Sequence, residues 1–127
     1  MTTIKSFTDI SQSKKLAEIL PLESADYHYI AQGEKSYFYP YSLSSDAVKD
    51  YDEEIKYIPC WSLAALLSVL PDTITNNGGI AFKLNIKKNI IEYSNPSLYL
   101  IHKFVKSNNL IDACVEMILK LNGLNLL

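Results

Sequence analysis

Apolar and other residues alternate most regularly between Ile80 and Lys87, where every second residue from Ile80 onward is isoleucine, phenylalanine or leucine. A period of two is typical of a β-strand with one buried face. Lys87–Asn89 suits a reversal of the chain, and Ile90–Tyr93 has the pattern of a returning strand. The pattern therefore predicts a β-hairpin with one apolar, buried face.

Helical spacing marks both ends of the chain. Near the N-terminus, Asp9 and Gln12 stand in capping-box positions, and the apolar residues that follow predict a short amphipathic helix over about residues 10–20. Near the C-terminus, Asn109 is a good cap, and apolar residues repeat at helical spacing up to Gly123. We expect a short helix at the start of the chain and a longer one at its end.

The segment Ile58–Pro71 predicts a central helix and contains the only tryptophan of the chain. Between Leu63 and Leu70 only Ser68 is polar, so the helix has no polar face. We therefore expect it to be buried on most sides. Its start is ambiguous. Pro59 suits a first helical position, whereas Ser62 is the better cap and would leave the residues before it extended.

Residues 98–106 are compatible with either a helix or a strand. Asn95-Pro96-Ser97 is a good helix start, whereas the aromatic and β-branched residues that follow favour a strand. A third strand is preferred, because an isolated two-stranded hairpin is marginally stable. The sequence thus predicts an α+β fold in a single domain over residues 1–127, with a small antiparallel sheet, either a hairpin or a three-stranded meander, packed by the central and C-terminal helices.

Seven of the nine tyrosines lie between Leu22 and Tyr57, in a segment without clear periodicity. Alternation at Tyr27–Ile30 and Tyr37–Tyr39 suggests short strands there. A tyrosine ring has a large apolar body and a polar tip, so this dense group either forms a contact surface for a partner or covers the core as a long ordered loop. The candidate contact residues are Tyr27, Tyr29, Tyr37, Tyr39 and Tyr41.

The basic residues are twelve lysines without a single arginine, and the formal net charge is −2. Arginine makes the commonest specific hydrogen bonds to guanine bases, and a negative net charge disfavours contact with phosphates. Sequence-specific nucleic-acid binding is therefore not expected. No secretory leader stands at Met1–Thr8, and no stretch approaches the ~20 apolar residues that a membrane span needs. We expect a cytoplasmic protein without membrane contact. Lys83, Lys87 and Lys88 leave open a face that binds anionic ligands.

Cys60 and Cys114 both fall within apolar patterns, which predicts that they are reduced and buried. The alternative is a cysteine nucleophile, because Cys60-Trp61-Ser62 resembles the start of the catalytic helix in papain-like proteases. His102 would be its base, as in compact NlpC/P60-type peptidases. Glu54 stands where the papain-like oxyanion glutamine is expected, and a carboxylate would repel the oxyanion. No acidic residue in a strand after His102 is placed to orient its ring, since only Asn108 and Asn109 follow there. Both features weaken this alternative.

Neither a metal nor another cofactor is expected. His28 and His102 lie far from each other and from the cysteines along the chain, without the local ligand pairs that metal sites use. We expect His28 to be a surface ring and His102 to lie on a face of the sheet. Gly78-Gly79 lacks the lysine and helix start of a phosphate loop and predicts a loop tip.

Two segments, Cys60–Leu67 (CWSLAALL) and Asp112–Leu121 (DACVEMILKL), resemble a family of short uncharacterised bacterial proteins that are often associated with prophages or other mobile elements. Phe7–Ala25 resembles the same family. The resemblance implies the order helix, variable segment at about residues 22–57, central helix, β-hairpin or meander, and final helix. It brings no activity and no site residues.

The sequence therefore favours a non-enzymatic accessory or protein-interaction module of a mobile element. Its partner, which could be a second copy of the chain, is expected to contact the Tyr27–Tyr57 segment or the apolar tail Leu124–Leu127. The alternative is the small cysteine hydrolase that uses Cys60 and His102.

Overall fold

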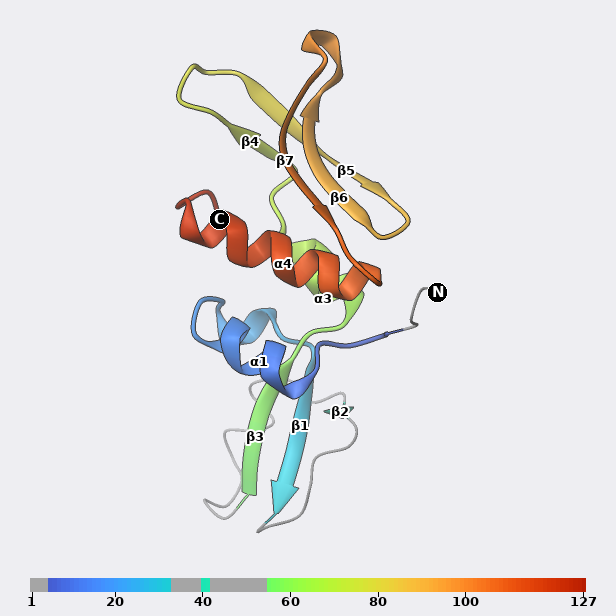
Figure 1. Ribbon diagram of the computed structural model, residues 1–127. Helices are drawn as coiled ribbons and strands as arrows, with labels where there is room; N and C mark the ends of the chain where they lie inside the picture. The colour runs from blue at the N-terminus through green and yellow to red at the C-terminus, as the bar shows by residue number, and fades with distance from the viewer. Residues whose placement is uncertain (1–4, 33–39, 42–54) are drawn as a thin grey trace. The chain divides into compact units, whose positions relative to one another are not determined.

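The computed structural model describes residues 5–32, 40–41 and 55–127 (Figure 1). The described part is an α+β fold with antiparallel sheets, and it divides into two compact units. The N-terminal unit comprises Ser6–Leu66, and the C-terminal unit comprises Leu67–Leu127 together with Lys5. The expectation that the whole chain acts as a single domain stays a prediction.

The described helices and strands follow one another in simple order. The N-terminal unit contains α1 (Ile10–Ala17), the 3₁₀-helix η1 (Leu22–Ser24), β1 (Tyr27–Gln32), β2 (Pro40–Tyr41) and β3 (Ile55–Cys60). The boundary between the two units falls within helix α3 (Leu63–Val69). The C-terminal unit contains β4 (Thr73–Thr75), β5 (Ala81–Lys87), β6 (Ile90–Asn95), the 3₁₀-helix η2 (Pro96–Leu98), β7 (Leu100–Lys106) and α4 (Leu110–Gly123).

In the N-terminal unit, the strands form a sheet in the order β2-β1-β3, and α1 packs against β3. The predicted capping box of α1 is present: the Asp9 carboxylate accepts from the Gln12 N–H at 2.8 Å, and the Gln12 side chain accepts from the Asp9 N–H at 3.0 Å. The predicted strand at Tyr27 is confirmed as β1, whereas Tyr37–Tyr39 lies outside the described residues. Strand β3 was not predicted.

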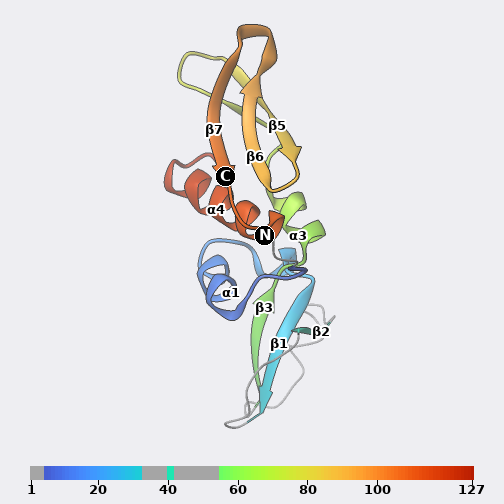
Figure 2. The same cartoon turned by 45° about the vertical axis from the view of Figure 1, so that its right-hand side comes forward.

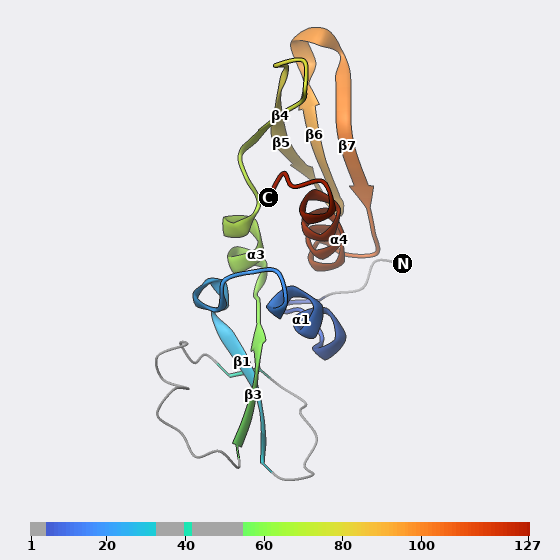
Figure 3. The ribbon, with the colours of Figure 1, turned by 90° about the vertical axis from the view of Figure 1, so that its left-hand side faces the viewer.

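In the C-terminal unit, β4-β5-β6-β7 is an antiparallel meander in which each strand pairs with the next along the chain. The predicted hairpin is confirmed as β5 and β6, and the preferred third strand is confirmed as β7. The short strand β4 adds a fourth. Figure 3 looks nearly along the axis of α4, which packs against β6 and β7.

A β-bulge interrupts the pairing of β6 with β7. Tyr93 lies opposite Lys103, but its neighbour Ser94 lies opposite Ile101, so His102 is the extra residue of β7. Successive side chains of a strand normally alternate between faces, and one extra residue resets that alternation. Ile101 and Phe104, three positions apart, therefore share one face of the sheet, which we call the outer face.

Helix α3 is less buried than its apolar sequence predicts. Among its residues only Leu66 is fully buried, while Ala64 and Ser68 are exposed. The cap at Ser62 is confirmed, because its hydroxyl accepts from the Ala65 N–H at 3.3 Å and Pro59 belongs to β3 rather than to the helix. An apolar sequence allows burial on every side, but a seven-residue helix does not have to be covered on every side.

Candidate interaction surface on the last β-strand

Large apolar side chains are exposed mainly around the turn that joins β6 to β7. Five of the nine exposed large hydrophobic residues in the described part of the chain fall within residues 98–104. They are Leu98, Tyr99, Leu100, Ile101 and Phe104, with exposed fractions of 51%, 95%, 43%, 60% and 47%. We call these five residues the apolar hairpin patch. Single exposed apolar side chains are ordinary, whereas several within one short segment are typical of a site of interaction.

The turn that carries the patch is held by Asn95. Its side-chain oxygen accepts from the Leu98 N–H at 3.2 Å, and its amide donates to the Ala81 carbonyl at 3.0 Å, which ties the turn to β5. The turn projects at the end of the sheet away from α4 (Figure 2). The exposure of the patch is therefore a property of an ordered turn.

Tyr99 has a backbone conformation that its side chain disfavours. Its φ is +54°, in the left-handed region, and its N–H donates to the Pro96 carbonyl at 3.2 Å. A bulky residue there costs on the order of 1 kcal/mol relative to glycine. Little packing offsets this cost, because Tyr99 is 95% exposed. A strained and fully presented aromatic ring is typical of a recognition site.

The outer face of the sheet extends the patch beyond the turn. Register places Ile101 beside Ser94, which lies beside Lys83, and it places Phe104 beside Glu92, which lies beside Asn85. The next row consists of Lys87, Ile90 and Lys106. The outer face therefore combines apolar side chains on β7 with lysines on β5 and β7.

A cavity of about 350 Å³ adjoins the patch on this face. Lys83 and Ser94 line it from neighbouring strands, and Asn95-Pro96-Ser97 line it from the turn. Glu92, the acidic residue of these rows, accepts from the Asn85 amide at 3.1 Å. The cavity thus presents a lysine and hydroxyl groups beside Ile101, which suits an acidic side chain of a partner.

Of the predicted tyrosine contacts, the structure describes the side chains of Tyr27 and Tyr29. Tyr29 is a core residue with 7% exposure, its hydroxyl donates to the Thr8 carbonyl at 2.7 Å, and burial raises its pKa to about 12, so its placement on a contact surface was wrong. The half-buried Tyr27 packs edge-on against Phe7, with ring centroids 4.6 Å apart. Tyr37 and Tyr39 lie outside the described residues, and of Tyr41 only the backbone pairing with His28 is described.

Cys60 is fully buried at the end of β3, in a polar cluster with Thr8. Its sulfur lies 3.6 Å from the Thr8 hydroxyl and 3.5 Å from the Thr8 carbonyl oxygen. Burial raises the pKa of the thiol above its ordinary value, against weaker lowering by hydrogen bonds from Thr8 and Ser13. The stabilisation of a thiolate by a helix N-terminus is absent, because α3 begins at Leu63.

His102 belongs to the C-terminal unit, whereas Cys60 belongs to the N-terminal unit. The His102 ring stacks on Phe82, with centroids 4.8 Å apart, as expected for a sheet-face ring. His28 was expected at the surface, but it is 2% exposed and packs edge-on to Tyr57. The two residues of the cysteine-hydrolase alternative therefore belong to different units, and neither unit by itself contains both.

Both thiols are expected to be unreactive in the folded protein. Cys60 and Cys114 are buried and free, as predicted, and burial raises the pKa of Cys114 to about 12. A raised pKa keeps a thiol protonated until the pH rises above its ordinary range, and only the thiolate reacts quickly. At about pH 8 a disulfide reagent should modify neither cysteine until denaturant is added. Fast modification of Cys60 in a folded Cys114→Ala variant would contradict this assignment.

No group of His, Cys, Asp and Glu residues able to hold a metal ion occurs within the described ranges. In the same residues no helix is long and apolar enough to cross a membrane. Comparisons with protein-family models, with curated proteins and with solved structures find no match to this chain.

The apolar hairpin patch was missed in the sequence because its residues were counted as strand formers. Leu98-Tyr99-Leu100-Ile101 directly follows the turn signal Asn95-Pro96-Ser97. This apolar run overlaps the turn itself instead of starting after it. That overlap is the signal that could have indicated an exposed tip.

Proposed function

We propose that this chain is a non-enzymatic protein-interaction module that binds an extended segment of a partner protein along β7. The main support is the apolar hairpin patch, where exposed apolar side chains are concentrated at one turn and one strand. Protein interfaces have apolar centres enriched in aromatic residues, and Tyr99 and Phe104 supply two such residues here.

Strand β7 is also suited to pair with another strand. It stands at the end of the order β4-β5-β6-β7, and among the described residues no strand pairs with its far side. An edge strand presents backbone N–H and C=O groups on which an extended peptide can add as a further strand. Its seven residues, Leu100–Lys106, are long enough to give such a peptide several main-chain hydrogen bonds.

The charges favour an acidic partner over a second copy of the chain. Strand β7 contains Lys103 and Lys106 and no acidic residue. Two such strands placed side by side would bring like charges together, which destabilises cross-strand pairs. A segment that combines apolar residues with Asp or Glu at every second position would instead place apolar side chains beside Ile101 and Phe104, and its carboxylates beside the lysines of the outer face.

The biological setting is proposed on separate grounds. The resemblance of Cys60–Leu67 and Asp112–Leu121 to short bacterial proteins of prophages and mobile elements supports an accessory role in such an element. The apolar tail Leu124–Leu127, which was considered as a second contact, has Leu124 and Leu127 partly exposed at 49% and 43%. The patch is favoured over the tail because it is larger and lies on an ordered turn and strand.

Selection from a random peptide library against the immobilised protein tests the proposal. We expect enriched peptides to carry both apolar and acidic residues at every second position, because an added strand presents every second side chain to the outer face. Replacing the acidic residues of an enriched peptide by lysine should weaken its binding by about tenfold or more. The proposal is wrong if no peptide is enriched, or if the enriched peptides bind equally well after that replacement.

A further inference from the structure

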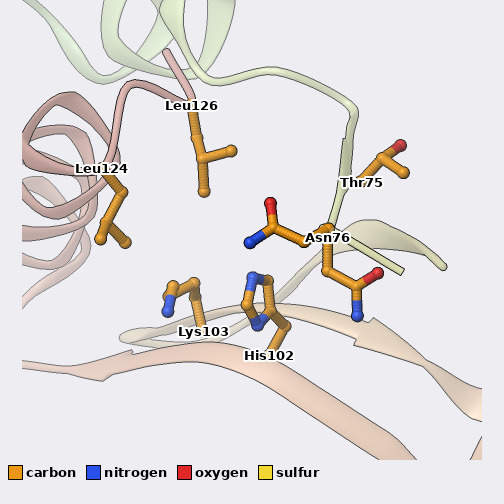
Figure 4. Close-up of a pocket in the computed structure, with 7 residues that line it drawn as sticks. Thr75, Asn76, His102, Lys103, Leu124 and Leu126 are labelled. Carbon is orange, nitrogen blue, oxygen red and sulfur yellow. The ribbon is translucent and has the colours of Figure 1, made fainter. Parts of the chain in front are cut away.

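A second cleft lies on the inner face of the same sheet, opposite to the outer face. It has a volume of about 210 Å³. Its walls come from three segments that are distant in sequence: the β4–β5 turn, the middle of β7 and the chain after α4 (Figure 4). All three belong to the C-terminal unit, so the cleft lies within a single compact unit.

The polar lining of the cleft donates hydrogen bonds and carries positive charge. His102 and Lys103 extend into it from β7, and Thr75 and Asn76 line it from the end of β4 and the turn that follows (Figure 4). Asn77 of the same turn also lines the cleft. The side-chain oxygen of Asn76 accepts from the N–H groups of Gly78 and Ile80, both at 2.9 Å, which leaves its amide NH₂ as the donor end. No acidic side chain of the described residues lines the cleft.

The β-bulge explains why two adjacent residues of one strand reach the same cleft. His102 is the extra residue of β7, and it faces the same side of the sheet as Lys103. Phe82, which is 3% exposed, stacks on the His102 ring at an interplanar angle of 29° and fixes its orientation. Lys103 makes no ion pair with any residue in the described ranges.

The opposite wall of the cleft is apolar. Leu124 and Leu126, from the segment that follows α4, face His102 and Lys103 across the cleft (Figure 4). The segment turns back through the left-handed Asn125, whose φ is +57°, and the Leu126 N–H donates to the Leu121 carbonyl at 2.9 Å. A cationic and amide wall facing a leucine wall suits a ligand with an anionic head and a short apolar stem.

The volume limits the ligand to a small molecule. Drug-sized ligands occupy cavities of roughly 300–1,000 Å³, so this cleft is below that range. At about 30 Å³ for each water molecule, the cleft holds on the order of seven waters. An aliphatic carboxylate of about six to eight non-hydrogen atoms fills a comparable space.

We propose that this cleft binds a short-chain aliphatic carboxylate, with its head between Lys103 and His102 and its stem against Leu124 and Leu126. This site is independent of the protein-binding surface. The two share strand β7, but Ile101 and Phe104 lie on the outer face of the sheet, and His102 and Lys103 line the cleft on its inner face. Failure of one proposal therefore leaves the other unaffected.

Hexanoate is a suitable probe, and the NMR signals of the leucine methyl groups and of the His102 ring report on its binding. We expect saturable shifts at Leu124, Leu126 and His102, with a dissociation constant on the order of 1 mM, as for other ligands of this size. Hexylamine has the same stem with a cationic head, and it should shift these signals only weakly. Equal shifts with hexylamine, or no shifts with hexanoate, would overturn the proposal.

Two variants separate specific binding from attraction to the protein as a whole. Lys103→Gln should weaken hexanoate binding by about tenfold, because it removes the full charge that faces the carboxylate. Lys88→Gln, at an exposed lysine of the β5–β6 turn, should leave the affinity unchanged. The same loss in both variants would show that hexanoate responds only to net charge, and the site would be disproved.

The dependence on pH gives a further readout. Burial and the neighbouring Lys103 lower the pKa of His102, so the ring is neutral at about pH 8 and gains a proton only as the solution becomes acidic. Lys103 is the titratable group beside it, since the facing residues Thr75, Asn76, Asn77, Leu124 and Leu126 carry no charge. Hexanoate should bind about three- to fivefold more tightly at about pH 5.5 than at about pH 8. His102→Gln should remove that difference, and its persistence would exclude a role for His102.

Discussion

Replacing Trp61 by alanine is expected to lower the free energy of unfolding by about 3–5 kcal/mol. The side chain is completely buried, and its indole N–H donates to the Ser24 hydroxyl at 3.0 Å. Alanine leaves a cavity that the surrounding core fills only in part, and it leaves Ser24 without this partner. Small domains are stabilised by about 5–15 kcal/mol, so this one substitution removes a large share.

The effect is large because the backbone of Trp61 also joins two segments. Its N–H donates to the Thr8 hydroxyl at 3.1 Å, and its carbonyl accepts from the Thr8 N–H at 3.0 Å. Urea unfolding followed by circular dichroism measures the change. Trp61→Phe keeps most of the volume and loses the indole donor, so it should cost clearly less than Trp61→Ala. A loss below about 1 kcal/mol for Trp61→Ala would contradict the buried position of Trp61.

Replacing Ile101 by aspartate is expected to weaken binding of a selected partner peptide by about 30- to 100-fold while leaving the fold intact. Ile101 is 60% exposed, so its replacement should change the free energy of unfolding by less than about 0.5 kcal/mol. Aspartate removes apolar contact area and repels an acidic peptide. Isothermal titration calorimetry gives the affinity, and thermal unfolding verifies that the variant is folded.

A pair of leucines provides a matched control. Leu98 and Leu22 are each 51% exposed, and each belongs to a short 3₁₀-helix, but only Leu98 lies in the apolar hairpin patch. Leu98→Asp should weaken peptide binding, and Leu22→Asp should not. If both variants bind as the wild type does, or if both lose affinity equally, the patch is not the contact surface.

Elements with a strong local pattern were predicted from the sequence. The alternation from Ile80 to Lys87 became β5, and the cap at Asn109 begins α4, where its side chain accepts from the Asp112 N–H at 2.8 Å. The stop at Gly123 was close to correct: α4 runs through Gly123, and the left-handed residue is Asn125 instead. These elements depend on neighbours a few residues away, which a single sequence contains.

Elements defined by distant pairing could not be predicted in the same way. Strand β4 has only three residues, and pairing with β5 is what makes it a strand. Strand β3 contains Pro59, which argues against a strand, yet the segment pairs with β1 along its whole length. His28 was expected at the surface because a polar residue in an irregular segment gives no sign of the core that forms around it.

The candidate sites depend on one feature that has no local sequence signature, the bulge at His102. A regular strand would place Ile101, Lys103 and Val105 on one face. The extra residue instead places Ile101 with Phe104 on the outer face, and it directs His102 and Lys103 into the inner cleft. The strand was predictable from its composition, but the faces of its side chains were not.

Amide hydrogen exchange of the protein with and without a selected peptide tests the central proposal most directly. In the free protein, amides on the unpaired side of an edge strand exchange quickly, and an added strand protects them. We expect protection to rise over residues 100–106 when the peptide binds and to stay unchanged in β1 and β3. Protection confined to the N-terminal unit, or none at β7 when the protein is saturated with peptide, would contradict it.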